Sequence, residues 1–269
     1  MKNVFKLLLS LLLTLNSCYK TEDDTGDTCL DDCTVIQGHI TTIHGAPVSN
    51  VPVEFEHTDS GMFWRDSRRI KKTKTDKNGF FHLKFYIEDE ELGEDADGYF
   101  HLITDFRSVD HDKYLLSNSI ELRNDFFVRY LGALQKRDTT IELDYYLPKK
   151  GLAKIRLENF IPIQEDDFFS VQVLFRGGNG VIEKWDVPIL DYQPLSRGER
   201  VKAFNVLSEF NDVPVAAGTE NVLQVDKRKN GVRNSEDIIL DVPENGGAAS
   251  LLPIKNYTHF LIIVLLTYL

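Results

Sequence analysis

The sequence predicts an all-β protein in which two β-sandwiches follow one another. From residue 34 onward, short runs of alternating apolar and polar residues recur, separated by turns rich in Gly, Asn and Pro. The second half of the chain shows no helical period. The chain has 269 residues, 42% of them hydrophobic, which is enough for two cores of ordinary domain size.

Composition narrows the classes of function. The 42 acidic and 31 basic side chains give a net charge of −11, which argues against a nucleic-acid partner. Three cysteines are too few for a disulfide scaffold or a multi-zinc protein. Neither a Gly-x-Ser-x-Gly elbow nor a phosphate loop occurs in the sequence. We therefore assign no catalytic residue, metal or cofactor, and expect the protein not to be an enzyme.

Residues 1–17 are predicted to be a signal peptide. Lys2 and Lys6 precede the apolar run Leu7–Leu15, which is shorter than the about 20 residues of a spanning helix. The run ends in Leu-Asn-Ser-Cys, which resembles the bacterial lipobox. The resemblance implies that Cys18 is acylated, for example by palmitate, becomes the new N-terminus and anchors the protein to a lipid bilayer. An ordinary secretory signal with a chance cysteine is the alternative.

Residues 18–33 are predicted to form a flexible acidic tether, because they contain nothing that could build a core. The run Lys20–Asp24 resembles the export tag of surface lipoproteins in the Bacteroidetes group. This implies an outer-membrane lipoprotein exposed on the cell surface, with the periplasmic face as the alternative. Cys29 and Cys33 are expected either to form a disulfide in that oxidising space or to remain two free thiols.

Residues 34–148 are predicted to form the first sandwich. Strands are expected at 35–40, 51–56 and 80–85, with a turn at Asp76–Gly79. The succession resembles the carboxypeptidase regulatory-like domain, a transthyretin-type sandwich. The residues that carry this resemblance are Gly38, the turn at 45–48, Val51, Val53 and the run Thr73–Phe80. The resemblance implies a fold and almost nothing about activity.

Two charged loops of this sandwich, at 58–69 and 88–98, are expected to emerge from the same end. The first contains arginines, Arg68 among them, and the second is acidic, so the two should attract each other. One interpretation is that the loops only hold each other in place. The other is that Phe63, Trp64 and Arg65 form a ligand contact, because an aromatic beside arginines is typical of interfaces.

The histidines of the first sandwich are expected to be solvated or to lie at the edge of the core, rather than to bind a ligand. They are His39, His44, His57, His82 and His101. Further strands are expected at 99–106, 114–122, 126–131 and 139–147.

Residues 149–269 are predicted to form a second, immunoglobulin-like sandwich after a linker at 148–151. Gly177–Gly180 is expected to be a hairpin turn. The apolar run Phe260–Leu269 is expected to be a final buried strand. A membrane-contacting tail and a lipid-anchor signal are the alternatives for it.

The leading hypothesis is a membrane-anchored lipoprotein that acts as a non-catalytic binding, adhesion or envelope-assembly module. Its partners would be the bilayer, through Cys18, and an unidentified protein or glycan. A first alternative is a carbohydrate-binding accessory protein of a glycan-uptake system, with Trp64 and Trp185 as platforms for sugars. A second alternative is a hydrolase whose scattered carboxylates form a site not visible in the sequence.

Overall fold

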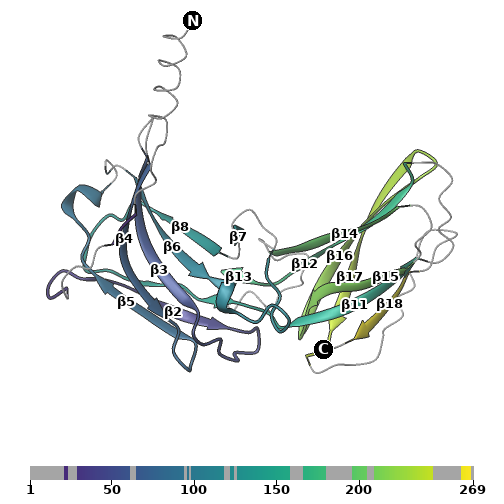
Figure 1. Cartoon of the computed structure of the whole chain (residues 1–269), viewed down its shortest axis with the longest axis horizontal. Coiled ribbons are helices and arrows are strands. Elements are labelled where there is room, and N and C mark those ends of the chain that lie inside the picture. Colours follow the sequence, from purple (N-terminus) through teal and green to yellow (C-terminus); the bar gives the residue numbers. More distant parts are fainter. Residues whose placement is uncertain are drawn as a thin grey trace, which may run out of the picture.

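The computed structural model of the chain describes residues 21–23, 29–60, 65–93, 96, 98–117, 122–123, 126–157, 166–179, 196–204, 209–244 and 262–267. These residues form two β-bodies that lie next to each other (Figure 1). The only helical elements among them are two short 3-10 turns, η1 at Asp89–Glu91 and η2 at Phe106–Ser108. No helix in the described ranges is long and apolar enough to cross a membrane. The prediction of an all-β chain with two consecutive sandwiches is confirmed.

The first body contains a six-stranded sheet in the order β1-β4-β3-β6-β8-β7. Its strands are β1 (Thr21–Asp23), β3 (Pro52–Ser60), β4 (Arg65–Lys74), β6 (Tyr99–Asp105), β7 (Leu122–Arg123) and β8 (Phe126–Gly132). The facing sheet has the order β13-β10-β2-β5, with β9 also paired to β2. Its strands are β2 (Thr34–Thr41), β5 (Phe80–Phe85), β9 (Thr140–Glu142), β10 (Tyr145–Tyr146) and β13 (Gly178–Asn179).

The core of the first body lies between these two sheets. Ile36 on β2 and Leu83 on β5 face Phe55 on β3 and Phe100 on β6, and all four are almost fully buried. The rings of Phe55 and Phe100 stack with centroids 5.4 Å apart. Because side chains alternate along a strand, the residues between these apolar positions lie on the opposite face of each sheet.

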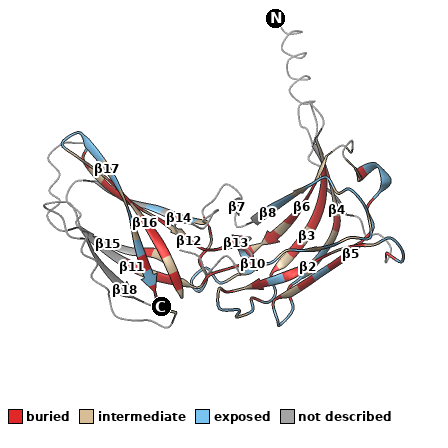
Figure 2. Cartoon of the chain, turned by 180° about the vertical axis from the view of Figure 1, so that it is seen from behind, coloured by how far each residue is buried: buried red, intermediate tan, exposed pale blue. Residues whose placement is uncertain are grey.

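The second body packs a three-stranded sheet, β15-β11-β18, against a four-stranded sheet, β14-β12-β16-β17. The strands are β11 (Lys150–Leu157), β12 (Phe168–Phe175), β14 (Ser196–Phe204), β15 (Glu209–Ala216), β16 (Thr219–Lys229), β17 (Val232–Val242) and β18 (Ile262–Thr267). Phe169 and Phe175 on β12 are buried against Val213 and Val215 on β15. Figure 2 shows buried residues concentrated on the strands of both bodies.

The expected linker at 148–151 forms backbone hydrogen bonds with Lys113 and Leu115. The Leu115 amide donates to the Pro148 carbonyl (2.9 Å), and the Lys150 amide donates to the Lys113 carbonyl (2.8 Å). The Leu115 side chain is buried in the core of the second body, although its neighbours belong to the first. The chain therefore passes from one body to the other through a short paired segment.

Several expected boundaries require correction. Arg65, Arg68 and Arg69 lie in strand β4, not in a loop. Thr21–Asp23 of the expected flexible tether is a strand that pairs in parallel with β4, with Glu22 in register with Arg68 and Asp23 in register with Arg69.

Two expectations for the second half have opposite outcomes. Gly178–Asn179 is not a hairpin turn: as β13 it pairs with Tyr145–Tyr146 of the first body. The C-terminal run does contain a strand, β18, which pairs antiparallel with β11. The burial of its side chains lies outside what the structure describes.

The residues that carry the family resemblance have structural roles. A Cβ on Gly38 would lie 2.0 Å from the Leu143 carbonyl oxygen, so only glycine fits there. The Thr75 hydroxyl donates to the Val48 carbonyl and accepts from the Val51 amide. The Asp76 carboxylate accepts from the amides of Asn78 and Phe80 and so closes the predicted turn.

Candidate functional site

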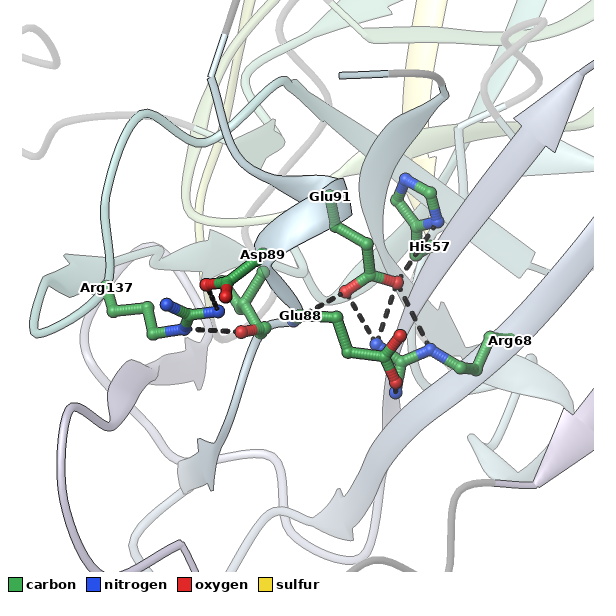
Figure 3. Close-up of polar contacts among 7 residues, drawn as sticks. His57, Arg68, Glu88, Asp89, Glu91 and Arg137 are labelled. Atoms are coloured by element: carbon green, nitrogen blue, oxygen red, sulfur yellow. Dashed lines mark hydrogen bonds and ion pairs between the residues drawn. The ribbon is translucent and has the colours of Figure 1, made fainter.

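A group of charged side chains around the buried Glu91, here called the ionic clasp, joins β3, β4 and η1 (Figure 3). It consists of His57, Arg68, Glu88 and Glu91. Arg68 Nη2 donates to both carboxylate oxygens of Glu91, at 2.7 and 2.6 Å, and Arg68 Nε donates to Oε1 at 3.1 Å. The Glu91 side chain is 7% exposed. The expected attraction between the two charged segments is thus present, and it lies inside the protein.

His57 and Glu88 complete the clasp. His57 Nδ1 lies 3.3 Å from Glu91 Oε1, and the Glu88 amide donates to Glu91 Oε2 at 3.1 Å. Glu88 Oε1 lies 3.6 Å from Arg68 Nη1. Both oxygens of Glu91 are therefore occupied by donors within the fold, which makes this carboxylate a structural group rather than a free base.

A second contact in Figure 3 attaches the same segment to the chain further on. Arg137 pairs with Asp89 and donates from Nε to the Ile87 carbonyl, and its guanidinium lies 4.2 Å above the Tyr86 ring. Asp89 and Glu91 thus fix the η1 turn from two sides.

The outward face of the six-stranded sheet has a different character, and we call it the polar face. Cross-strand partners share a face, so the register gives its rows directly. Arg69, Glu56, His101 and Tyr130 form one row across β4, β3, β6 and β8. Ser67, Thr58 and Tyr99 form the row beside it, and Lys72, Glu54 and Ile103 form the row on the other side.

Charged groups on the polar face pair with one another. Arg69 Nε donates to Glu54 Oε2 at 2.9 Å and lies 3.8 Å from Glu56 Oε1. Glu56 Oε2 lies 3.3 Å from His101 Nε2, and both side chains are only 5–6% exposed. A chain of ionic contacts therefore crosses three strands.

Two tyrosines flank this chain of contacts. Their ring centroids are 5.6 Å apart, and the His101 ring lies 5.8 Å from Tyr99 and 6.2 Å from Tyr130. Tyr130 is 60% exposed. His101 Nδ1 is buried and has no hydrogen-bond partner within the described part of the chain, which is an unusual condition for a buried polar atom.

A third set of charges lies where the two bodies meet. Lys149 Nζ donates to Glu244 at 2.7 Å, and this hydrogen bond holds the pKa of the Glu244 carboxyl below its usual value. His44 Nε2 donates to the Gly218 carbonyl oxygen at 2.9 Å and lies 3.9 Å from Glu244 Oε2.

The candidate residues from the sequence have different outcomes. Cys29 and Cys33 are joined by a disulfide directly before β2. Arg65 lies at the start of β4. Cys18, Phe63, Trp64 and Trp185 lie outside the described residues. Over the described ranges, no group of three or more His, Cys, Asp or Glu side chains is arranged to hold a metal ion.

The polar face is not among the sites expected from the sequence. The histidines are expected to be solvated or to lie at the edge of the core, whereas His57 and His101 are buried in ion pairs with Glu91 and Glu56. One signal in the sequence points to this face: Tyr99 and His101 lie two positions apart on one strand, so their side chains lie on the same face of the sheet. The row that adds Tyr130 depends on strand order, which no local pattern specifies.

Known proteins resemble this chain only weakly, in sequence and in fold. No family model and no curated protein match the sequence. A streptococcal ancillary pilin matches 80% of this chain, and the match spans 62% of the pilin, at 11% identity and a TM-score of 0.29. BcpA, the major pilin subunit of Bacillus cereus, matches 81% of this chain and 70% of its own, at 9% identity and a TM-score of 0.26.

A third solved structure, 3-chlorocatechol 1,2-dioxygenase from Rhodococcus opacus 1CP, matches 49% of this chain and 62% of its own. The identity is 14% and the TM-score is 0.23. Likenesses at this level carry no implication for function.

Proposed function

We propose that this protein is a lipid-anchored, non-catalytic binding or adhesion module of the bacterial outer membrane, exposed on the cell surface. Acylated Cys18 holds it to the bilayer. Residues 18–33, of which Thr21–Asp23 pair with β4, connect the anchor to the fold, and two bodies, built mainly from 34–148 and 149–269, present the binding surfaces. We retain the carboxypeptidase regulatory-like and immunoglobulin-like types as the proposed identities of the two bodies.

The observation that carries the proposal is the Cys29–Cys33 disulfide. Disulfides persist in oxidising compartments and are rare in the cytosol. The first cysteine of the bond lies eleven residues after Cys18 along the chain, and the second directly precedes strand β2. The disulfide therefore supports export of the protein to an oxidising compartment, which a lipid anchor at Cys18 also requires.

The buried ionic groups support a binding role over a catalytic one. Glu91 is occupied by Arg68 and His57, Glu56 by His101, and Asp226 by Arg233. Paired in this way, these carboxylates contribute to the fold, whereas a general base needs a lone pair directed at a substrate.

Metabolic labelling tests the anchor. Cells that express the full-length protein take up an alkyne-tagged palmitate, and the tag is detected on the purified chain. We expect label on the wild type and none on Cys18→Ser, because only the first cysteine lies in a lipobox. Cys29→Ser is the matched control and should remain labelled. Label on Cys18→Ser, or an unlabelled wild type, contradicts the proposal.

Protease treatment of intact cells tests the display. We expect an added protease to remove the protein from intact cells while a periplasmic marker survives. Degradation that requires prior permeabilisation of the outer membrane would contradict surface exposure and place the protein on the periplasmic side.

A further inference from the structure

We propose that the polar face of the first body binds a neutral glycan, at a site formed by Tyr99, Tyr130, His101, Glu54 and Arg69. This inference rests on the proposed binding function and specifies its ligand class. It names Tyr99 and Tyr130, in place of Trp64 and Trp185, as the platforms for sugars.

The aromatic component comes from two tyrosines on neighbouring strands. Tyr99 and Tyr130 lie with ring centroids 5.6 Å apart, and Tyr130 is 60% exposed. An exposed tyrosine on the outside of a sheet offers a rigid apolar ring with a polar tip, which suits a ligand that is apolar on one side and hydroxylated on the other. The C–H faces of pyranose rings have this character.

The polar component lies on β3 and β4, in the row that contains Tyr130 and in the neighbouring row. Glu54, which is 28% exposed, can accept hydrogen bonds from hydroxyls, and the Arg69 guanidinium can donate to them, whereas the buried Glu56 holds Arg69 and His101 in place. Because Arg69 already bridges the two carboxylates, at 2.9 and 3.8 Å, the three groups have fixed relative positions. Adjacent hydroxyls of a sugar match such pairs of acceptors and donors.

The charges on the polar face determine which class of glycan it favours. The rows of the face bring together three carboxylates, Asp23, Glu54 and Glu56, and two cations, Arg69 and Lys72, so the cations are not in excess. A polyanionic glycan therefore gains no net attraction from this face. The polar face therefore favours a neutral glycan.

His101 adds an observation that is independent of the tyrosines. Its Nε2 faces Glu56, whereas its buried Nδ1 lacks a partner. Such an atom carries a desolvation penalty that a hydrogen bond would remove. A hydroxyl both donates and accepts, so it can pair with Nδ1 in either protonation state of the ring. In the proposal, an outward turn of the exposed Tyr130 ring admits a ligand hydroxyl to this nitrogen.

Affinity electrophoresis tests the inference with the full-length protein in mild detergent. The probes are laminarin, mannan, xylan and dextran, each cast separately into a native gel, with polygalacturonate as the anionic counter-probe. We expect at least one neutral polysaccharide to retard the wild-type protein and polygalacturonate not to. Tyr130→Ala and Tyr99→Ala should each weaken the apparent affinity about tenfold, as expected for aromatic hot spots.

Two further variants make the result specific. Tyr130→Phe retains the ring and should keep most of the affinity. Tyr86→Ala removes a tyrosine that is 47% exposed elsewhere in the first body and should leave retardation unchanged. Thermal melting of each variant verifies folding.

The inference is overturned if no neutral polysaccharide retards the wild type, if polygalacturonate retards it as strongly, or if Tyr130→Ala and Tyr86→Ala behave alike. These outcomes leave the anchor untouched, because palmitate uptake at Cys18 is measured separately. A failure of labelling in turn leaves the retardation assay unaffected.

Discussion

Arg68 on β4 donates three hydrogen bonds to Glu91 on η1, and the carboxylate that receives them is 7% exposed. The two residues are 23 positions apart in the chain. Their pairing fixes the acidic segment 88–91 on the edge of the core, beside His57 and Phe100. A bidentate contact of this kind is geometrically specific, because the planar guanidinium fits a carboxylate in one orientation.

Removal of Arg68 should destabilise the first body strongly. In Arg68→Met, Glu91 would remain buried with only His57 and an amide beside it, and breaking a buried pair from one side costs about 3–5 kcal/mol. We expect a loss of this order in the free energy of unfolding measured in urea.

Arg107→Met is the matched control for this variant. It breaks another bidentate pair, with Asp105, in which the arginine is 61% exposed, and should change stability by less than about 1 kcal/mol. Equal losses for the two variants would show that the clasp behaves as an ordinary surface pair.

Gly98→Ala should be more harmful than Gly93→Ala, although both glycines have positive φ angles, of +92° and +97°. At Gly93 a Cβ meets nothing within 4 Å, so the expected loss is the left-handed penalty of roughly 1–2 kcal/mol. At Gly98 it would lie 2.4 Å from the Thr58 carbonyl oxygen and 2.8 Å from His57 Nε2. We expect about 2 kcal/mol more there, from overpacking.

Urea unfolding of these two glycine variants and the wild type gives the comparison. The closeness of Gly98 to the clasp predicts that the resonances of His57 shift in Gly98→Ala alone. If the two variants lose the same stability, the close approach at Gly98 does not constrain the fold.

Asp226 makes the stability of the second body depend on pH. Its pKa is held below the ordinary 3.8 chiefly by the hydrogen bond from Arg233, against the opposing effect of burial. A carboxylate with a lowered pKa in the folded state stabilises the protein above the pKa of the unfolded state, and this contribution is lost as pH falls through the folded pKa. The relevant window therefore lies below about pH 4.

Urea unfolding of Asp226→Asn and the wild type between pH 3 and pH 7 measures this effect. The difference in unfolding free energy should be constant from pH 7 to about pH 5 and should shrink toward pH 3. Arg233→Met should reduce the same difference, because it removes the main cause of the shift. A gap between the wild type and Asp226→Asn that stays constant down to pH 3 would contradict the assignment.

Trypsin should not cut the native protein between the two bodies, even though Lys149 and Lys150 are adjacent there. The Lys150 amide is bonded to Lys113, Lys149 Nζ is bonded to Glu244, and Lys150 begins strand β11. Limited proteolysis followed by mass spectrometry should find cleavage at this pair only when urea is added. Early cleavage without urea would show that the junction is an open linker.

The sequence predicted the first sandwich where local chemistry determines structure. The turn at Asp76–Gly79 was predictable because Asp and Gly have the turn chemistry that the structure uses, including a φ of +73° at Gly79. The start of β4 was missed because Arg65–Arg69 shows no apolar alternation: this part of the strand is held by ionic partners on neighbouring segments.

The candidate site was predictable only in outline. The charges near 68 and 91 predicted that two segments meet, but burial of the pair depends on the whole sandwich. The polar face could not be predicted, because β8 lies directly beside β6 in the sheet although β7 lies between them in the sequence. Pattern analysis assigns residues to strands, whereas side-by-side order is set by packing across the sheet.

Because β13 pairs with β10, a sheet of the first body is completed by a strand that follows two strands of the second body in the sequence. Tyr145–Tyr146 ends the first body, yet the strand beside it, Gly178–Asn179, emerges from a ribosome or an export channel only after more than thirty further residues. Leu115 is likewise buried among side chains that appear after residue 150. A fragment that ends at residue 148 would lack the strand that pairs with Tyr145–Tyr146 and would expose the Leu115 side chain, so a stable first body requires residues past 179.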